Sequence, residues 1–184
     1  MHSDPGETAN LVELRHALHR RPELGGCEKQ TMRRIREELA ALPLEVMPPL
    51  IGTDTVAILR GGKPGKCVAL RADIDALPIR EESGETFSSE TPGVMHACGH
   101  DVHSTILLGA ALALARRRDL SGTVLFIWQP GEEKYAMGKI LVEAGVLEDP
   151  APDFVVWRVQ RKRQRRLGVQ VKNPTVPCSL AMLI

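Results

Sequence analysis

The segment Thr123–Trp128 (TVLFIW) constrains the fold more than any other part of the sequence. It is a continuous run of apolar and β-branched residues and lacks the polar alternation of a strand with one face in water. Such a run is typical of a strand that is buried on both faces, as in sheets with helices on either side. We therefore expect an α/β fold that contains this segment as a fully buried strand.

The segments around TVLFIW follow the order that parallel strands require. From Cys67 onward the sequence predicts a strand, a helix, a strand, a helix and a strand, at Cys67–Arg71, about Asp101–Arg118, Thr123–Trp128, Lys134–Ala144 and from Phe154–Trp157. This alternation is the order of βαβ units with right-handed crossovers. We predict a mixed, largely parallel sheet flanked by helices.

The first part of the chain predicts a helical pair followed by a hairpin. Apolar residues recur at helical spacing in residues 11–18 and again in 32–42, with RPELGG between them. The β-prone runs Thr55–Leu59 and Cys67–Arg71 are joined by the turn-rich loop GGKPG, so antiparallel pairing is the simplest expectation. Residues 73–99 have no periodic pattern, and a stretch of that length inside a compact domain is usually functional.

Composition limits the class of protein. The 184 residues suffice for one domain or for part of a larger one, and 43% apolar with 26% charged residues is typical of a soluble globular protein. The longest apolar run, Ile106–Ala115, is too short to span a membrane and is followed by three arginines. The N-terminus lacks the regions of a signal peptide, so we expect a cytoplasmic protein. The four cysteines form no C-x-x-C motif, which argues against a zinc knuckle.

Two segments concentrate residues that bind metals, and the first is MHACGHDVH (Met95–His103), before an expected helix. Gly99 separates Cys98 from His100, and its freedom at positive φ lets both side chains aim at one point. A thiolate and an imidazole both suit zinc, manganese or a similar divalent ion. Asp101 can cap the helix or orient the imidazole. The alternative is a polar loop in which the cysteine is simply buried.

The second segment, QPGEE (Gln129–Glu133), directly follows the strand TVLFIW. Ligands bind at the carboxyl ends of strands in open α/β sheets, so both segments can converge on one crevice. Burial of Glu132 and Glu133 as charges requires a counter-charge, because desolvation costs several kcal/mol for each ion. With a divalent metal present, one carboxylate can bind it while the other accepts a proton from the activated water. The alternative is a solvated helix N-terminus, where glutamate is favoured anyway.

Four motifs occur in order along the chain: LHRRPELG (Leu18–Gly25), RADIDALPI (Arg71–Ile79), MHACGHDVH and QPGEE. The combination resembles the M20 family of metallopeptidases, specifically its amidohydrolase branch of hippurate hydrolases, N-acyl-amino-acid hydrolases and auxin-conjugate hydrolases. The likeness extends from about Leu11 to Asp153. It implies a catalytic domain like that of the zinc-dependent exopeptidases, of which this chain would hold an incomplete, N-terminal part.

The resemblance also implies roles for individual residues. Family members hold two divalent ions in a cleft, and the sequence does not distinguish Zn, Mn, Co or Ni. Cys98, His100 and Glu133 match family metal ligands, and Glu132 matches the general base that activates water. Further residues are expected to lie near the site and to support the ligands from behind: Asp73, Asp75, Asp101 and His103. His16 and His19 are expected on the surface of the first helix.

The sequence changes character near residue 157. Residues 1–157 contain all 23 acidic residues and 17 of the 24 basic ones, whereas residues 158–184 contain seven basic residues and no acidic one. Where the family carries a G-x-H-like segment this chain has Trp157–Gln160, and no histidine follows His103. We expect residues 1–157 to be the N-terminal part of the catalytic domain. Residues 158–184 form a basic tail without a helix or strand pattern, for which a reading-frame change is one hypothesis.

The expected partner is a small molecule, an N-acyl amino acid or a similar conjugate whose amide bond is cleaved by metal-activated water. Full-length family members are about twice as long, and the resemblance leaves a homo-oligomer possible for the full-length protein. The alternative is a truncated, non-catalytic and inactive remnant that binds at most one metal ion. The basic run also invites a nucleic-acid interpretation, which the absence of interleaved aromatic residues disfavours.

Overall fold

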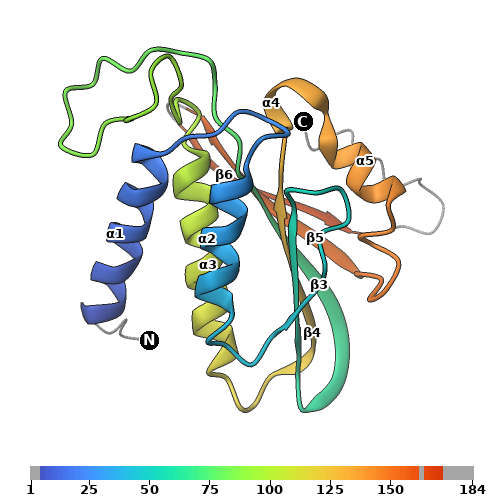
Figure 1. Ribbon diagram of the computed structural model, residues 1–184. Coiled ribbons are helices and arrows are strands. Elements are labelled where there is room, and N and C mark those ends of the chain that lie inside the picture. Colours follow the sequence, from blue (N-terminus) through green and yellow to red (C-terminus); the bar gives the residue numbers. More distant parts are fainter. Residues whose placement is uncertain (1–4, 162–163, 172–184) are drawn as a thin grey trace.

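The computed structural model (Figure 1) describes residues 5–161 and 164–171. Its helices are α1 (Pro5–Arg20), α2 (Lys29–Leu39), α3 (His100–Ala115), α4 (Glu132–Tyr135) and α5 (Met137–Glu143). Its strands are β1 (Glu45–Val46), β2 (Thr55–Arg60), β3 (Lys63–Asp73), β4 (Ser121–Gln129), β5 (Phe154–Arg161) and β6 (Gln164–Val171). Helices α1, α2 and α3 cover one face of the sheet, and α5 packs on the other.

The strands of the described residues form one mixed sheet in the order β1-β2-β4-β3-β5-β6. Strand β3 pairs in parallel with β4 on one side and with β5 on the other. The remaining pairs, β1 with β2, β2 with β4 and β5 with β6, are antiparallel. The predicted mixed α/β sheet is therefore confirmed, and its parallel part consists of β3, β4 and β5.

Strand β4 is buried on both faces, as its sequence predicts. Val124, Phe126 and Trp128 pack in the core under α1, α2 and α3. Leu125 and Ile127 point the other way, into a second core that includes Leu141 of α5 and Val155 of β5. Burial of each such large apolar side chain contributes about 1.5–3 kcal/mol. This strand therefore joins the two cores of the molecule.

The predicted hairpin of β2 and β3 is wrong, because β4 lies between these two strands and pairs with both. A β2–β3 hairpin would take one side of β3, which pairs in parallel with β4 on one side and with β5 on the other. Gly61 allows the alternative path, since a Cβ there would collide with the carbonyl oxygen of Leu120, just before β4. The chain thus leaves β2 against the start of β4 and enters β3 on its far side.

Strand β6 lies in the basic segment, where no helix or strand was expected. It pairs antiparallel with β5, with Val156 opposite Val169. The alternation of Leu167, Val169 and Val171 with polar or small residues is a strand pattern that the high density of charge obscured. Strand β5 itself runs past residue 157 to Arg161, so the expected domain boundary at 157/158 falls within a strand and stays a prediction.

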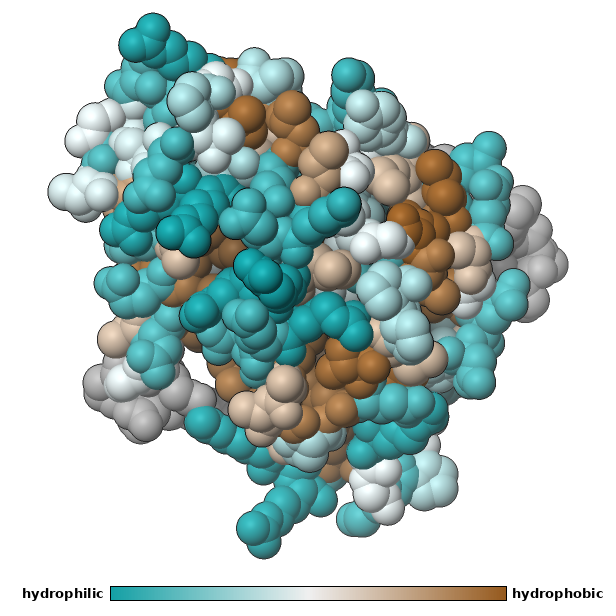
Figure 2. Space-filling view, in the orientation of Figure 1, coloured by the Kyte–Doolittle hydropathy of each residue, from teal (hydrophilic) through white to brown (hydrophobic). Residues whose placement is uncertain are grey.

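The outer surface is mixed. In the space-filling view hydrophilic residues cover most of this face, and the hydrophobic surface is divided into separate patches (Figure 2). No helix in the part of the chain that the structure describes is long and apolar enough to cross a membrane.

Candidate metal centre

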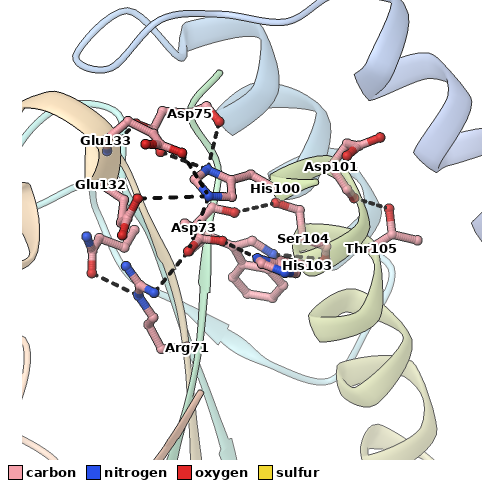
Figure 3. A network of polar contacts seen from close by, with 12 residues as sticks. Arg71, Asp73, Asp75, His100, Asp101, His103, Ser104, Thr105, Glu132 and Glu133 are labelled. Atoms are coloured by element: carbon pink, nitrogen blue, oxygen red, sulfur yellow. Dashed lines mark hydrogen bonds and ion pairs between the residues drawn. The ribbon is translucent and has the colours of Figure 1, made fainter. Parts of the chain in front are cut away.

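Both predicted ligand segments meet at the carboxyl ends of β3 and β4 (Figure 3). The two strands end level with each other, with Asp73 opposite Gln129. The irregular segment after β3 contributes Asp75, and the turn after β4 leads into α4 with Glu132 and Glu133. The loop before α3 adds Cys98, and the first residue of α3 adds His100. Segments that are distant in sequence therefore converge on one edge of the sheet.

The three residues expected to bind metal lie together. Ligand atoms of Cys98, His100 and Glu133 all lie within 4.8 Å of one another. The imidazole is buried, whereas the cysteine is exposed and the Glu133 side chain is 22% exposed. One side of the group is thus open to solvent, as the entry of an ion or a substrate requires.

His100 is oriented by Asp75. Its Nδ1 lies 2.8 Å from the backbone oxygen and 3.1 Å from the carboxylate Oδ1 of that residue, so Nδ1 donates a hydrogen bond to it. The other ring nitrogen, Nε2, faces three carboxylates. It lies 3.6 Å from Asp73 Oδ2, 3.7 Å from Glu133 Oε1 and 3.9 Å from Glu132 Oε2. These separations exceed hydrogen-bond length, and a fixed imidazole tautomer with a free nitrogen is the usual preparation for metal binding.

The electrostatics of the group favour a cation. Burial alone would lower the pKa of His100, but the hydrogen bond to Asp75 and the surrounding carboxylates raise it to about 9. Desolvation of the thiol, with the adjacent Glu133, raises the pKa of Cys98 to about 12. Burial and the charge of Asp73 raise the pKa of Glu132. Without a metal, protons neutralise this excess of negative charge, and a divalent ion can replace them. The donor set therefore fits a metal ion.

Asp73 and His103 lie behind this group. They form a second cluster with His100 whose ligand atoms also lie within 4.8 Å. The Asp73 carboxylate is already paired, because Oδ1 accepts a 2.6 Å hydrogen bond from His103 Nδ1 and Oδ2 lies 3.0 Å from Nη1 of Arg71. These contacts outweigh burial and lower the pKa of Asp73. The arrangement favours a supporting position for both residues rather than a second cation site.

Asp101 turns away from the group. Its Oδ2 lies 2.7 Å from His19 Nδ1 and 2.8 Å from Arg15 Nε, both on α1. The expected surface position of His19 is wrong, since this residue is only 5% exposed. The buried carboxylate at the start of α3 draws cationic partners from the neighbouring helix. The signal in the sequence is that His19 follows Leu18, at the edge of the apolar stripe of its helix.

Sequence reasoning missed other residues near the site. Glu28 is fully buried, and its carboxylate accepts a hydrogen bond from the backbone nitrogen of Gly131. Arg71 Nε donates a 2.9 Å hydrogen bond to Gln129 Oε1, which ties the ends of β3 and β4 together. Glu28 could have been found from its spacing, because it stands seven residues before Ile35 on the apolar face of α2.

Comparison with known proteins identifies the family. The sequence profile of peptidase family M20/M25/M40 matches residues 69–173, more than half of the chain. The chain belongs to this family. The M20 membership predicted from the four motifs is thereby confirmed.

The curated relatives of similar sequence include a deacetylase, an amidohydrolase and a hydrolase of amino acid conjugates. The chain is 42% identical over 154 residues to the N-acetylcysteine deacetylase of Bacillus subtilis, a match that covers 83% of this chain and 40% of that protein. It is 42% identical over 142 residues to the N-acyl-L-amino acid amidohydrolase of Geobacillus stearothermophilus, covering 76% and 38%. An IAA-amino acid hydrolase of Arabidopsis thaliana is 44% identical over 145 residues, covering 78% and 33%. The chain thus spans about two fifths or less of the length of these relatives.

A solved M20 structure supports both the fold and the metal cofactor. A dinuclear metal-binding peptidase of Bacillus subtilis is 42% identical to this chain, with a TM-score of 0.76. The match covers 79% of this chain and 41% of that protein. The predicted fold class and a divalent metal as cofactor agree with this relative and with the donor set described above.

Proposed function

We propose that this chain forms the metal-binding part of an amidohydrolase that cleaves the amide bond of N-acyl amino acids or similar conjugates. The observation that carries the proposal is the convergence of Cys98, His100, Glu132 and Glu133 at one edge of the sheet. The names of the relatives, which include deacetylases and amidohydrolases of N-acyl amino acids, support the substrate class.

The metal would be held by the Cys98 sulfur, His100 Nε2 and a Glu133 oxygen. This mixture of thiolate, imidazole and carboxylate suits several divalent ions, including Zn and Co. When bound, divalent ions polarise the amide carbonyl and lower the pKa of water. Asp75 keeps Nε2 of His100 free for this role, because it occupies Nδ1.

Glu132 is the proposed general base. Its carboxylate lies at the same cluster, 3.9 Å from His100 Nε2, with a side chain that is 18% exposed. Glu132 accepts a proton from the attacking water and delivers it to the amine nitrogen as the C–N bond breaks. Burial raises the pKa of this carboxyl group, which makes its conjugate acid a better match for that second transfer near neutral pH.

The experiment is a metal titration followed by an amidase assay on the purified 184-residue chain. The chain is stripped with a chelator, loaded separately with Zn, Mn, Co or Ni, and tested on N-acetyl and N-benzoyl amino acids. Hydrolysis that requires the metal and disappears in Glu132→Gln would support the proposal. Tight metal binding without hydrolysis would instead support the alternative, a non-catalytic chain that binds one ion. Failure to bind any of the four metals would overturn the amidohydrolase proposal and would leave only the non-catalytic alternative.

A further inference from the structure

Glu28 is a buried carboxylate that does not serve its own helix. It occupies the position before α2 where a side chain usually caps the helix, yet it makes no capping hydrogen bond. Glu23 caps α2 instead, since its carboxylate accepts hydrogen bonds from the backbone nitrogens of Gln30 and Thr31 at 3.2 and 2.8 Å. Glu28 is nevertheless fully buried, which is costly for a carboxylate without specific partners.

The partners of Glu28 lie far along the chain. One oxygen, Oε1, accepts a 2.8 Å hydrogen bond from the backbone nitrogen of Gly131, which is 103 residues away. The other, Oε2, accepts a 2.8 Å hydrogen bond from the Thr53 hydroxyl. Burial raises the pKa of Glu28, and these two hydrogen bonds to the carboxylate reduce the size of that rise. The side chain therefore ties the start of α2 to the turn after β4.

The contacted turn has a demanding conformation. Gly131 has a φ of +55°, in the left-handed region, and a Cβ at this position would collide with Met137. The backbone of the RPELGG loop presses against it, because a Cβ added at Gly25 would lie 3.0 Å from the Gly131 Cα. A hydrogen bond to the Gly131 nitrogen thus acts on a backbone that has little room to adjust.

This turn leads directly into the two glutamates of the candidate site. A second buried carboxylate, Asp75, accepts a 2.9 Å hydrogen bond from the backbone nitrogen of Glu133. We propose that Glu28 is a positioning residue, which fixes the Gly131 turn and, together with Asp75, aims Glu132 and Glu133 at His100. This role rests on the proposed function, because it acts through the ligand and the base named there.

The test compares two substitutions of similar size in the 184-residue chain. Glu28→Met removes the acceptor, whereas Glu28→Gln keeps an amide oxygen for Gly131 and can donate to the Thr53 oxygen. Glu23→Gln is the matched control, since it perturbs the capping of α2 without contact to Gly131. The probe is Co²⁺, read by its dissociation constant and by the thiolate-to-Co²⁺ absorption band, neither of which requires turnover.

We expect Glu28→Met to weaken Co²⁺ binding about tenfold or more and to alter the absorption band, as outer partners of metal sites do. For Glu28→Gln and Glu23→Gln, the dissociation constant of Co²⁺ should stay within about twofold of the wild-type value, a much smaller change than the loss expected for Glu28→Met. If Glu28→Met does not fold, Glu28→Asp decides, because its shorter carboxylate cannot reach both partners and should also weaken binding. The positioning role would be overturned if Glu28→Met or Glu28→Asp had the Co²⁺ affinity and absorption band of the wild type. It would also be overturned if Glu23→Gln lost as much Co²⁺ affinity as Glu28→Met.

The wild-type chain separates this inference from the proposed function. A wild type that takes up Co²⁺ without a thiolate band would overturn the metal site itself, and with it any role of Glu28 in aiming the ligands. A wild type with the band, combined with unchanged binding in the Glu28 variants, would overturn the positioning role alone.

Discussion

At the scale of single residues, the geometry of the site depends on which hydrogen-bond partner each oxygen of its buried carboxylates has. Asp75 uses one oxygen for the ring of His100 and the other for the backbone of Glu133, so it orients two proposed ligands at once. The two oxygens of Asp73 are instead bound to Arg71 and His103, so this carboxylate does not orient a proposed ligand in the same way. The consequence is that His100 Nε2, with Glu132 and Glu133 beside it, is the point where a cation is best accommodated.

Replacement of Cys98 by alanine should abolish tight binding of a divalent ion. The thiol has an exposed face, so its loss should change the free energy of unfolding little, as is usual for surface substitutions. Equilibrium dialysis with elemental analysis measures the bound metal. Cys27→Ala is the control, because Cys27 is also exposed but belongs to neither cluster of metal-binding side chains found in the described residues. Unchanged metal content in Cys98→Ala would show that the proposed ligand set is wrong.

The two adjacent glutamates should behave differently. Glu133→Gln should lose metal, since a neutral amide is a poor substitute for an anionic ligand. Glu132→Gln should keep the metal but lower turnover of an N-acyl amino acid by about 10²–10⁴-fold, the usual contribution of a general base. Metal content and initial rates measured on the same preparations test both statements. The reverse pattern would mean that the roles of the two carboxylates are exchanged.

Residues within a motif were predictable, and residues that act across the fold were not. Cys98 and His100 are separated by a single residue, so their proximity follows from local geometry alone. The contacts of His19 with Asp101 and of Glu28 with Gly131 span 82 and 103 residues. They depend on how α1 and α2 pack against the sheet, which periodicity in the sequence does not specify.

At the scale of elements, the sequence predicts how deeply a strand is buried better than which strands it pairs with. The apolar pattern of β4 predicted its depth correctly but not its neighbours, because a pattern of side chains gives no partner for the backbone. The GGKPG loop suggested a hairpin by its length, yet β4 separates β2 from β3. Pairing follows from the competition among all strands for one sheet, and no single loop contains that information.

The packing of α1 on α3 should depend on pH through His19. This residue bridges Asp101 of α3 and Glu81 of the irregular segment between β3 and α3. The hydrogen bond to Asp101 outweighs burial and raises the pKa of His19 above 6.5. Its stabilising contribution is therefore complete below about pH 6.5 and is lost as the pH rises through the folded-state value. In the chelated protein, His19→Gln should lower the free energy of unfolding by about 1–3 kcal/mol at acidic pH and by less under alkaline conditions.

Urea denaturation at several pH values measures this difference. His16→Gln is the matched control, because His16 stacks on Phe87 at a centroid distance of 4.0 Å and lies on the same helix. The difference between the two variants isolates the contribution of the His19 contacts with Asp101 and Glu81. A loss in His19→Gln that is constant from acidic to alkaline pH would contradict a charged bridge.

At the scale of the whole molecule, the site gathers distant parts of the chain at one sheet edge. The donors come from the loop before α3, from the first residue of α3 and from the start of α4, and their supports come from the residue before α2 and from the end of β3. A cation at this edge would therefore add a further link between the starts of α3 and α4. Because an unfolded chain does not hold these donors together, metal binding and folding must be thermodynamically linked.

Metal should therefore stabilise the folded chain by an amount that its affinity predicts. A ligand that binds only the native state raises the free energy of unfolding by about 2.7 kcal/mol at a free concentration of 100 times its dissociation constant. For a domain of this size the midpoint of thermal unfolding should rise by about 5–10 °C, at about 2–4 °C per kcal/mol. Scanning calorimetry with Zn²⁺ or Co²⁺, followed by excess chelator, measures the shift and its reversal. Cys98→Ala should abolish the increase, whereas Glu132→Gln should retain it because the base is not a ligand. An equal increase in wild type and Cys98→Ala would place the stabilising ion elsewhere on the molecule and contradict the proposed centre.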